Sequence, residues 1–418
     1  MKRRVVITGL GAITPIGNDV NSMWESAKNG INGIDHITLF DVSNQKVKVA
    51  GEVKNFNPED HLEPKEARRM DRTMVFGLVA ATEAFEHSNL KKEDIDSDRF
   101  GVFVSSGIGG LWTINEEARK AHEKGVDRIS PFFIPNAIIN LVGGRIAIKY
   151  QAKGPVLPIV TACSSATNSI GEAFRYIRDG YIELAFAGGA EAPINELGVG
   201  GFASMKALNF TSNKDEASIP FDKRRSGFVI AEGAGVIILE ELEHALKRKA
   251  TIFAEMVGYG TTCDAFHITA PDETAYGITK CMENALLDGN VDPTWIDYIN
   301  PHGTSTFYND KIETLGIKNV FKKHAYEINI GATKSMHGHS LGAVGGIEAI
   351  ISIKALMENI IPPTINYVEK DPECDLNYTP NVAVKRIVKY ALSNSLGFGG
   401  QNATIIFKKW EDSNHVDK

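Results

Sequence analysis

The chain has 418 residues, of which 43% are hydrophobic and 23% charged, as in an ordinary soluble globular protein with a large core. A net charge of −7 argues against general affinity for nucleic acid, and no apolar run approaches the ~18 to 20 residues that cross a bilayer. Cys163, Cys263, Cys281 and Cys374 form no C-x-x-C pair, which indicates neither a zinc ribbon nor a disulfide framework. We therefore expect a cytoplasmic protein that does not insert into membranes.

Short apolar runs of strand-forming residues alternate with helical patterns from the start of the chain. The run that follows Arg4 is interpreted as a core strand and not as a secretion signal, because Thr8 and Gly9 interrupt it early. In chain order we expect a strand at 4–7, a helix at 72–85, strands at 101–104 and 156–160, a helix at 166–177, strands at 185–187, 235–239 and 253–257, a helix at 276–287, strands at 296–299 and 328–330, a helix at 341–356 and a strand at 403–407. This alternation predicts an α/β fold with buried sheets.

Two of the predicted strands carry the same short pattern. A strand that reaches Gly-x-Gly occurs at Gly9-Leu10-Gly11 and again at Gly258-Tyr259-Gly260. The repeat suggests two similar halves, residues 1–250 and 251–418. No low-complexity linker separates them, so the halves are expected to share a core.

The glycine-rich segments do not predict a nucleotide cofactor. Gly9-Leu10-Gly11 lacks the third glycine of a dinucleotide fingerprint, and Lys334 lacks the preceding glycine of a phosphate loop. The glycines at 107–110 and 397–400 permit unusual backbone angles, which serve either the close approach of a ligand or tight packing. No cofactor is expected.

Cys163 lies between the predicted strand 156–160 and the predicted helix 166–177. Unpaired N–H groups and the positive dipole end of that helix would favour a thiolate, so we expect a pKa lowered to roughly 3.5 to 7.5. A lone cysteine is more commonly a small buried hydrophobe. The position at a strand-to-helix junction favours a nucleophile.

His302 and His339 each stand in a glycine-containing loop after an apolar strand. A thiolate near two imidazoles suits acyl transfer, because ring N–H groups can polarise a carbonyl oxygen. The backbone N–H groups of Cys163 and Phe398 are candidates for an oxyanion hole. His337 and His339 also admit a metal-site interpretation, but no nearby cysteine or carboxylate completes a ligand set, so no catalytic metal is expected.

Four ordered motifs carry a resemblance to a known family: Thr161-Ala162-Cys163-Ser164-Ser165-Ala166, His302-Gly303-Thr304-Ser305-Thr306, Lys334-Ser335-Met336-His337-Gly338-His339 and Gly397-Phe398-Gly399-Gly400. They closely resemble the β-ketoacyl-acyl-carrier-protein synthases, the elongating condensing enzymes of the thiolase superfamily, and the synthase II group most of all. The resemblance runs from Arg4 to about Lys408. It implies the thiolase fold, two mixed-sheet halves in a five-layer αβαβα arrangement, as a homodimer.

The resemblance implies a role for each matching residue. Cys163 would accept an acyl chain from acyl carrier protein, and His302 and His339 would hold the malonyl thioester oxygen while carbon dioxide leaves. The resulting carbanion would attack the Cys163 thioester and lengthen a fatty acyl chain by two carbons. Lys334 would support His339, or form a structural ion pair with Glu348. Phe398 would be a gate that moves when the cysteine is acylated.

Further residues match substrate-binding positions of the family. Ile108 matches the residue that swings aside for long acyl chains, and the expected pantetheine channel contains Phe202, Thr269, Thr304 and Thr306. A surface for the acidic carrier protein is expected at six basic residues: Lys65, Arg68, Arg69, Lys124, Arg128 and Lys206. A structural monovalent cation site is expected at Asn300, Glu348, Ser393 and Asn394.

Three departures from the family pattern stand out. Phe307-Tyr308 follows the His302 motif where proline is usual, His337 replaces a common threonine, and Gln401 replaces another. None removes a catalytic group. They bear on the cavity entrance, the substrate preference and the protonation of the histidine loop.

Other activities compete with this interpretation. A biosynthetic thiolase needs a second catalytic cysteine, which Cys374-Asp375-Leu376 does not supply, and an initiating condensing enzyme pairs its cysteine with histidine and asparagine. A non-catalytic chain-length factor lacks the nucleophile, and a cysteine hydrolase does not explain the paired histidines. A ketosynthase of a polyketide pathway shares the motifs and stays open as the alternative.

Overall fold

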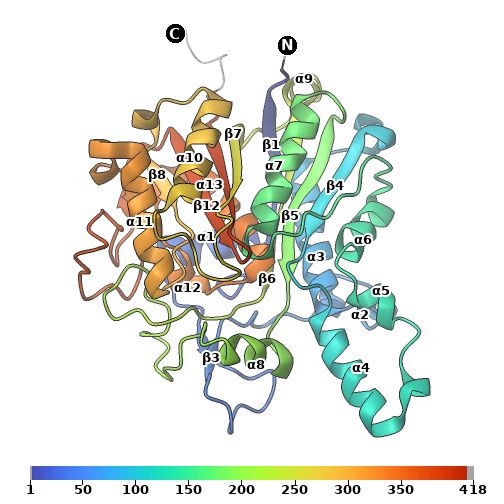
Figure 1. Cartoon of the computed structure of the whole chain (residues 1–418). Coiled ribbons are helices and arrows are strands. Elements are labelled where there is room, and N and C mark those ends of the chain that lie inside the picture. The colour runs from blue at the N-terminus through green and yellow to red at the C-terminus, as the bar shows by residue number, and fades with distance from the viewer. Residues whose placement is uncertain (1, 412–418) are drawn as a thin grey trace.

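The computed structural model describes residues 2–411, and within them one mixed sheet of nine strands runs through the molecule (Figure 1). Its strand order is β4-β5-β6-β1-β7-β13-β12-β8-β9. The strands of this sheet are β1 (Val5–Ile13), β4 (Phe100–Ser105), β5 (Leu184–Glu191), β6 (Gly233–Glu241), β7 (Ala254–Cys263), β8 (Tyr298–Asn300), β9 (Asn329–Ile330), β12 (Tyr390–Gly397) and β13 (Gln401–Lys409). The short strands β2 (Asp35–His36), β3 (Val49–Ala50), β10 (Ile360–Ile361) and β11 (Val384–Lys385) form two small separate sheets.

The chain forms thirteen α-helices among the described residues. They are α1 (Val20–Lys28), α2 (Pro64–Ala67), α3 (Arg72–Ser88), α4 (Leu111–Lys124), α5 (Phe133–Ala137), α6 (Leu141–Tyr150), α7 (Ser165–Arg178), α8 (Glu196–Ser204), α9 (Leu242–Lys247), α10 (Tyr276–Gly289), α11 (Phe307–Phe321), α12 (Lys334–His337) and α13 (Val344–Glu358). Several of them, including α3, α7, α10 and α13, cover the faces of this sheet. Among the described residues, no helix combines the length and the apolar character that a membrane span requires.

The sheet consists of two similar halves that meet at one seam. Strands β4, β5, β6 and β1 come from the first half and β7, β13, β12, β8 and β9 from the second, and β1 pairs with β7 antiparallel at the seam. Each half is mixed, because β4–β5 and β8–β12 are parallel while β5–β6 and β12–β13 are antiparallel. The prediction of an α/β fold with two related mixed-sheet halves is therefore confirmed.

The repeated Gly-x-Gly pattern has the same packing role in each half. A Cβ atom on Gly9 or Gly11 would overlap carbonyl oxygens of the outer helix α3, and one on Gly258 or Gly260 would overlap carbonyl oxygens of α10. Glycine thus lets an outer helix lie directly on the first strand of its own half. The pattern marks a repeated helix-on-strand contact.

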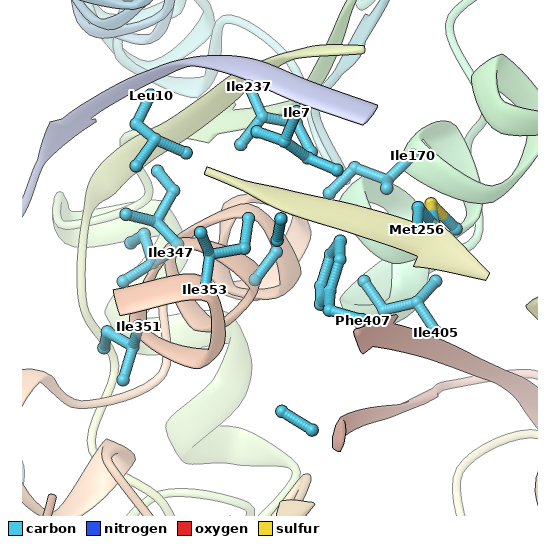
Figure 2. Close-up of a cluster of buried hydrophobic side chains, with 14 of the residues drawn as sticks. Ile7, Leu10, Ile170, Ile237, Met256, Ile347, Ile351, Ile353, Ile405 and Phe407 are labelled. Carbon is cyan, nitrogen blue, oxygen red and sulfur yellow. The ribbon is translucent and has the colours of Figure 1, made fainter. Parts of the chain in front are cut away.

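Helices α7 and α13 form the central layer between the two halves. Helix α13 contacts β6 of the first half and β12 of the second, and α7 contacts β5 and also β13. Their apolar faces meet the inner faces of the sheet in one cluster, of which Figure 2 labels Ile7, Ile170, Ile237, Ile347 and Phe407 among others. The outer helices α3 and α10 complete the five-layer arrangement.

The two central helices begin in the same way. A short 3-10 turn precedes each, at Ala162–Ser164 before α7 and at Leu341–Ala343 before α13. The first residue of each turn is not glycine but has a positive φ, +51° at Ala162 and +44° at Leu341. Such angles are unfavourable for residues with a Cβ, so the surrounding structure must impose them.

One expected strand is absent, and one strand was missed. Residues 156–160 form no regular strand, because Pro155 and Pro158 lack the N–H groups that a ladder requires. Only Val156 makes a bridge, to Val102. Val160 is 44% exposed, so this segment is not a buried strand. Strand β12 was not predicted from the sequence, because its centre is polar.

Candidate active site

Cys163, His302 and His339 open onto one cavity of about 430 Å³. Cys163 lies in the 3-10 turn before α7, His302 follows β8, and His339 lies between α12 and the turn before α13. The two imidazole rings are 5.2 Å apart between centroids and almost perpendicular, at 85°. The fold therefore places the thiol and the two imidazoles, which were expected to act together, in the wall of the same cavity.

Both histidines are buried and are held neutral by their surroundings. Burial, and then the positive charge of Lys334, hold the pKa of His302 and of His339 well below the usual value. Within residues 2–411 neither Nδ1 atom has a hydrogen-bond partner. A neutral ring carries one N–H, which it can donate to an oxygen in the cavity.

Hydrogen bonds hold the backbone of both histidines, and the groups that accept these bonds were not predicted from the sequence. Glu313 on α11 accepts hydrogen bonds from the backbone N–H of His302 at 2.7 Å and of Gly303 at 2.9 Å. The N–H of His339 donates to the Val229 carbonyl at 2.8 Å. Only the spacing of Glu313, eleven residues after His302, offered a signal.

Lys334 lies behind the cavity, not in its wall. Its Nζ atom donates to Glu348 Oε1 at 2.6 Å, and both side chains are almost completely buried. The predicted ion pair with Glu348 is confirmed. The ammonium group disfavours protonation of both imidazoles, so it acts on the cavity by its charge.

The expectation of a lowered thiol pKa at Cys163 is wrong. Burial raises its pKa to about 12, and the negative charge of Glu191 adds to that effect. The charge of Lys334 and the N–H groups of Phe398 and Cys163 itself oppose the rise but do not overcome it. The free protein therefore holds a neutral thiol, since desolvation outweighs the helix terminus.

The loop that carries Phe398 closes one side of the cavity. Gly399 and Gly400 have φ of +87° and +74°, angles that a residue with a side chain rarely adopts. Gly397 lies so close to Thr161 and Cys163 that a Cβ there would clash with the Thr161 carbonyl. Phe398 thus lines the cavity on a glycine-flanked loop, as a movable side chain requires.

The expected pantetheine residues Phe202, Thr269, Thr304 and Thr306 all line the cavity. The hydroxyl groups of Thr304 and Thr306 lie 2.9 Å apart and share a hydrogen bond.

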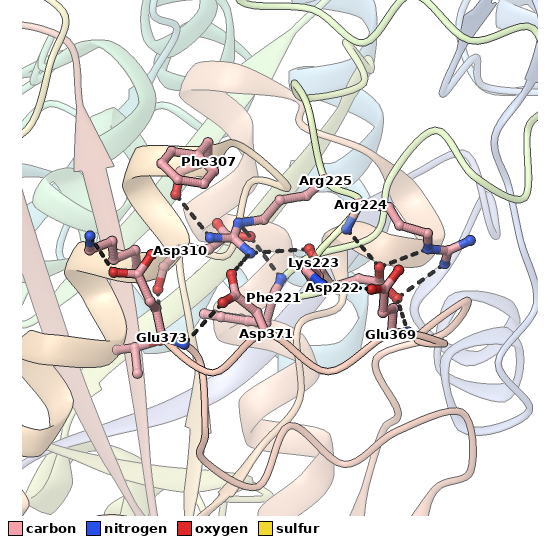
Figure 3. A network of polar contacts seen from close by, with 12 residues as sticks. Phe221, Asp222, Lys223, Arg224, Arg225, Phe307, Asp310, Glu369, Asp371 and Glu373 are labelled. Atoms are coloured by element: carbon pink, nitrogen blue, oxygen red, sulfur yellow. Dashed lines mark hydrogen bonds and ion pairs between the residues drawn. The ribbon is translucent and has the colours of Figure 1, made fainter.

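A buried ion network supports this threonine loop from beneath (Figure 3). Arg225, whose side chain is fully buried, donates to the carbonyls of Thr306 and Phe307 at 3.2 and 3.1 Å and to Asp371 at 2.6 Å. Asp310 accepts from the N–H of Thr304 at 3.1 Å. Arg225 was not predicted because its partners are distant in sequence, and Asp310 was not predicted although Thr304 is only six residues away.

Ile108 and the basic residues lie further out. Ile108 packs against the apolar cluster that contains Cys163 and does not line the cavity itself. All six basic residues are exposed, and they occupy three places: Lys206 at the cavity mouth, Lys65, Arg68 and Arg69 in and just after α2, and Lys124 and Arg128 at the end of α4. Figure 1 shows α4 projecting from the body of the molecule.

His337 has both ring nitrogens occupied inside the protein. Its Nδ1 lies 2.9 Å from the Gly338 carbonyl and its Nε2 lies 3.1 Å from the Thr333 hydroxyl. Burial, with the charge of Lys334, lowers its pKa to about 3. His337 is therefore a neutral structural group and not a partner of His339 in binding a metal.

We expect the stability of the protein to fall below about pH 6.5, the ordinary histidine pKa. His302, His337 and His339 stay neutral when folded, whereas the unfolded chain binds protons on them, so protonation favours unfolding. Each contributes a loss of about 1.4 kcal/mol between roughly pH 7.5 and 5.5. His337→Thr should reduce the loss of unfolding free energy between pH 7.5 and pH 5.5 by about 1.4 kcal/mol, measured by denaturant unfolding at each of these pH values. An identical loss in the variant and the parent would contradict the assignment of His337 as a buried neutral group.

Three buried oxygen atoms at the expected cation site have no hydrogen-bond partner within the described residues. They are Asn300 Oδ1, Glu348 Oε2 and Ser393 Oγ, and Ser393 pairs with Asn300 across β8 and β12. Asn394 is different, because its Oδ1 accepts from Thr404 at 2.7 Å. Oxygen donors of this kind fit a hard monovalent cation.

Comparison with known proteins gives consistent matches along the chain. The Beta-ketoacyl synthase N-terminal domain family matches residues 2–245, and the Beta-ketoacyl synthase C-terminal domain family matches residues 253–368. The 3-oxoacyl-[acyl-carrier-protein] synthase 2 of Staphylococcus aureus (strain N315) is 48% identical over 409 residues, 98% of this chain and 99% of that protein. The protein of the same name from Synechocystis sp. (strain ATCC 27184 / PCC 6803 / Kazusa) is 48% identical over 411 residues, with the same coverage of both chains.

A solved structure matches as well. A ketosynthase in complex with its type II polyketide acyl carrier protein, bound to the hexaketide, has a TM-score of 0.91 at 33% identity. The match covers 98% of this chain and 100% of that chain.

Proposed function

The chain belongs to the β-ketoacyl synthase family, and from this premise we propose that it is an acyltransferase that elongates fatty acids by the decarboxylative condensation of malonyl-acyl-carrier-protein with an enzyme-bound acyl thioester. One observation carries the proposal. A thiol and two neutral imidazoles line a single buried cavity, which suits enolate formation beside a thioester.

The first step loads Cys163. Its sulfur attacks the thioester carbonyl of an acyl carrier protein, the carrier thiol leaves with the cysteine proton, and the acyl group stays on Sγ. The backbone N–H groups of Cys163 and Phe398 are aimed at this sulfur and stabilise the oxyanion that forms there. Acylation replaces a buried thiol by a neutral thioester, so no buried charge persists.

The second step generates the carbanion. The bond from the malonyl α-carbon to its carboxylate breaks, carbon dioxide leaves, and the electron pair passes to the thioester enolate. His302 and His339 each donate an N–H to the enolate oxygen, an interaction that strengthens as negative charge develops. The α-carbon then attacks the acyl carbonyl on Cys163, the carbon–sulfur bond breaks, and the β-ketoacyl product stays on the carrier.

The degree of similarity favours fatty acid elongation over the polyketide alternative. Identity to the two synthase 2 proteins is 48%, against 33% to the polyketide ketosynthase. No cofactor enters the steps above. The acyl carrier protein delivers both substrates, and Thr304 and Thr306 supply hydroxyl groups for its pantetheine arm.

The remaining parts of the proposal concern assembly and surroundings. We assign the nucleophile to residues 1–250 and the imidazoles to residues 251–418. A homodimer is supported by exposed apolar side chains near the β4 edge: Phe132, Ile134, Ile138, Leu157 and Val160.

A cytoplasmic location suits a reactive thiol, and all four cysteines are free. A monovalent cation would be held by Asn300, Glu348 and Ser393, with the Glu348 carboxylate as its negatively charged ligand.

The direct test incubates the purified protein with malonyl carrier protein and acyl carrier proteins of graded length. We expect β-ketoacyl products two carbons longer than each primer, identified by mass. Free fatty acid in place of condensed product would indicate a hydrolase. Stepwise accumulation of unreduced polyketide chains would favour the polyketide alternative.

We expect Ile108→Phe to shorten the longest acyl chain that the protein accepts. Ile108 packs against the apolar cluster around Cys163, and added ring volume there occupies space that a long chain needs. Acylation rates measured across chain lengths should fall for long chains by about tenfold or more, roughly 1.4 kcal/mol, and stay near normal for short ones. Ile108→Val is the control and should keep the parental profile; an unchanged profile in Ile108→Phe would count against this pocket.

A further inference from the structure

A buried carboxylate at the end of β5, Glu191, raises the pKa of Cys163 by its charge but takes no direct part in the steps proposed above. Glu191 is only 1% exposed and accepts four hydrogen bonds. The Ser106 hydroxyl donates to Oε1 at 2.5 Å and the Ile108 N–H at 3.2 Å, while the N–H groups of Gly107 and Gly342 donate to Oε2 at 2.7 and 3.0 Å. One side chain thus joins two loops that are far apart in sequence.

The two loops are shaped to meet on this carboxylate. A Cβ on Gly107 would lie 2.9 Å from Glu191 Oε2, and a Cβ on Gly342 would lie 2.6 Å from the same atom. A Cβ on Gly342 would also overlap the backbone nitrogen of Gly107. Glycine at both positions is therefore what lets the loops reach the carboxylate together.

Each loop carries a part of the proposed active site. The first holds Ile108, and its turn is tightened by a hydrogen bond from the Gly109 N–H to the Ser106 hydroxyl at 2.8 Å. The second lies three residues beyond His339, in the 3-10 turn that contains Leu341. Leu341, Ile108 and Cys163 belong to one apolar cluster. Ile108 and the imidazole segment are thus attached to the same group.

Burial raises the pKa of Glu191, whereas its four hydrogen-bond donors favour the ionised form. Four donors occupy the acceptor positions of an ionised carboxylate, whereas a protonated acid would have to give up one of them. Each hydrogen bond to a buried charge is stronger than a neutral one, so the joined loops resist displacement. Movement of the backbone at Ile108 requires its own N–H, or the Ser106 hydroxyl, to move away from Glu191.

We propose that Glu191 is a positioning residue that sets acyl-chain selectivity, by holding the Ser106–Gly109 turn against the segment after His339. The inference rests on the proposed condensing function and deepens it. A chain that fits without moving Ile108 leaves the hydrogen bonds intact. A longer chain must displace the turn and weaken them, so the carboxylate opposes long chains.

The test uses two variants that loosen different parts of this attachment. Ser106→Ala removes a hydrogen bond on the Ile108 side only, and the Gly342 contact stays. Glu191→Gln places an amide group against N–H donors, so it loosens both sides. Ser105→Ala is the matched control for the first, since Ser105 is bonded to Ser169 and not to Glu191. Glu83→Gln is the control for the second, because Glu83 accepts two backbone N–H groups far from the cavity.

We expect Ser106→Ala to raise the ratio of long-chain to short-chain acylation rates by at least about threefold, with malonyl decarboxylation changed less than about twofold. Glu191→Gln should raise the same ratio and also slow decarboxylation, because the segment after His339 is released. Both controls should keep the parental ratio, and melting temperatures identify any variant that fails to fold. Parental ratios in a folded Ser106→Ala protein, or equal changes in the controls, would overturn the inference. Absence of condensation by the parent protein would instead refute the proposed function.

Discussion

Cys163→Ala is expected to abolish condensation, by at least about 1,000-fold, while decarboxylation of malonyl carrier protein continues. Without the sulfur no acyl group can be held beside the enolate. The imidazoles of His302 and His339 are untouched, and both lie in the wall of the same cavity. Product masses report condensation and released carbon dioxide reports decarboxylation, so the two activities separate in one protein.

The control for this variant is Cys281→Ala. Cys281 is a second buried thiol whose pKa is also raised by burial to about 12, but it lies on α10 and outside the cavity. It should keep condensation within a few-fold of the parent. Normal product formation by Cys163→Ala would rule out the sulfur as the acyl carrier. Loss of decarboxylation as well would mean that the thiol also shapes the malonyl site.

His302→Ala or His339→Ala should lower malonyl decarboxylation by about 100-fold to 1,000-fold, roughly 2.7 to 4 kcal/mol. Each substitution removes one N–H donor to the developing enolate, at a place where burial makes such a donor effective. Condensation should fall at least as much, because it consumes the same enolate. Loading of Cys163 by acyl carrier protein should change much less, so single-turnover acylation separates the two steps.

The conservative control is His302→Asn, which keeps a side-chain N–H in the cavity. Its decarboxylation should lie between that of the parent and that of His302→Ala. A double variant should cost less than the sum of the single ones, because both donors act on one oxygen. Equal activity of the Ala and Asn variants would show that His302 contributes shape and not a donor.

The sequence predicted the reacting groups better than their electrostatics. The motifs around Cys163, His302 and His339 indicated the three groups that share the cavity. The thiol pKa was wrong in sign because the helix terminus can be read from the sequence, whereas the apolar cluster around Cys163 arises only on folding. Desolvation depends on neighbours that a linear pattern does not show.

The supporting residues were beyond sequence reasoning for a related reason. Glu191 meets Gly342 across 151 positions, and Arg225 meets Asp371 across 146. Such partners are joined by topology, and nothing in their local pattern identifies them. Glu313 and Asp310 do lie near their partners in the chain, at eleven residues from His302 and six from Thr304.

Secondary structure could be predicted where apolar residues recur at a regular spacing in the sequence. The four predicted helices are all present, as α3, α7, α10 and α13. Strand β12 was missed because Ser393, Asn394 and Ser395, all fully buried, interrupt its apolar pattern. Two of these polar side chains form buried hydrogen bonds, Asn394 with Thr404 and Ser395 with Thr167, which a linear pattern does not show.

The matching turns at the start of α7 and α13 show how the reacting groups are shared between the two halves. Ala162 and Leu341 stand three residues before their helices, with the same unfavourable backbone sign. The same backbone turn thus occurs twice, once beside a nucleophile and once beside a hydrogen-bond donor. The two halves share this turn but carry different reacting groups, and neither half alone holds the complete set.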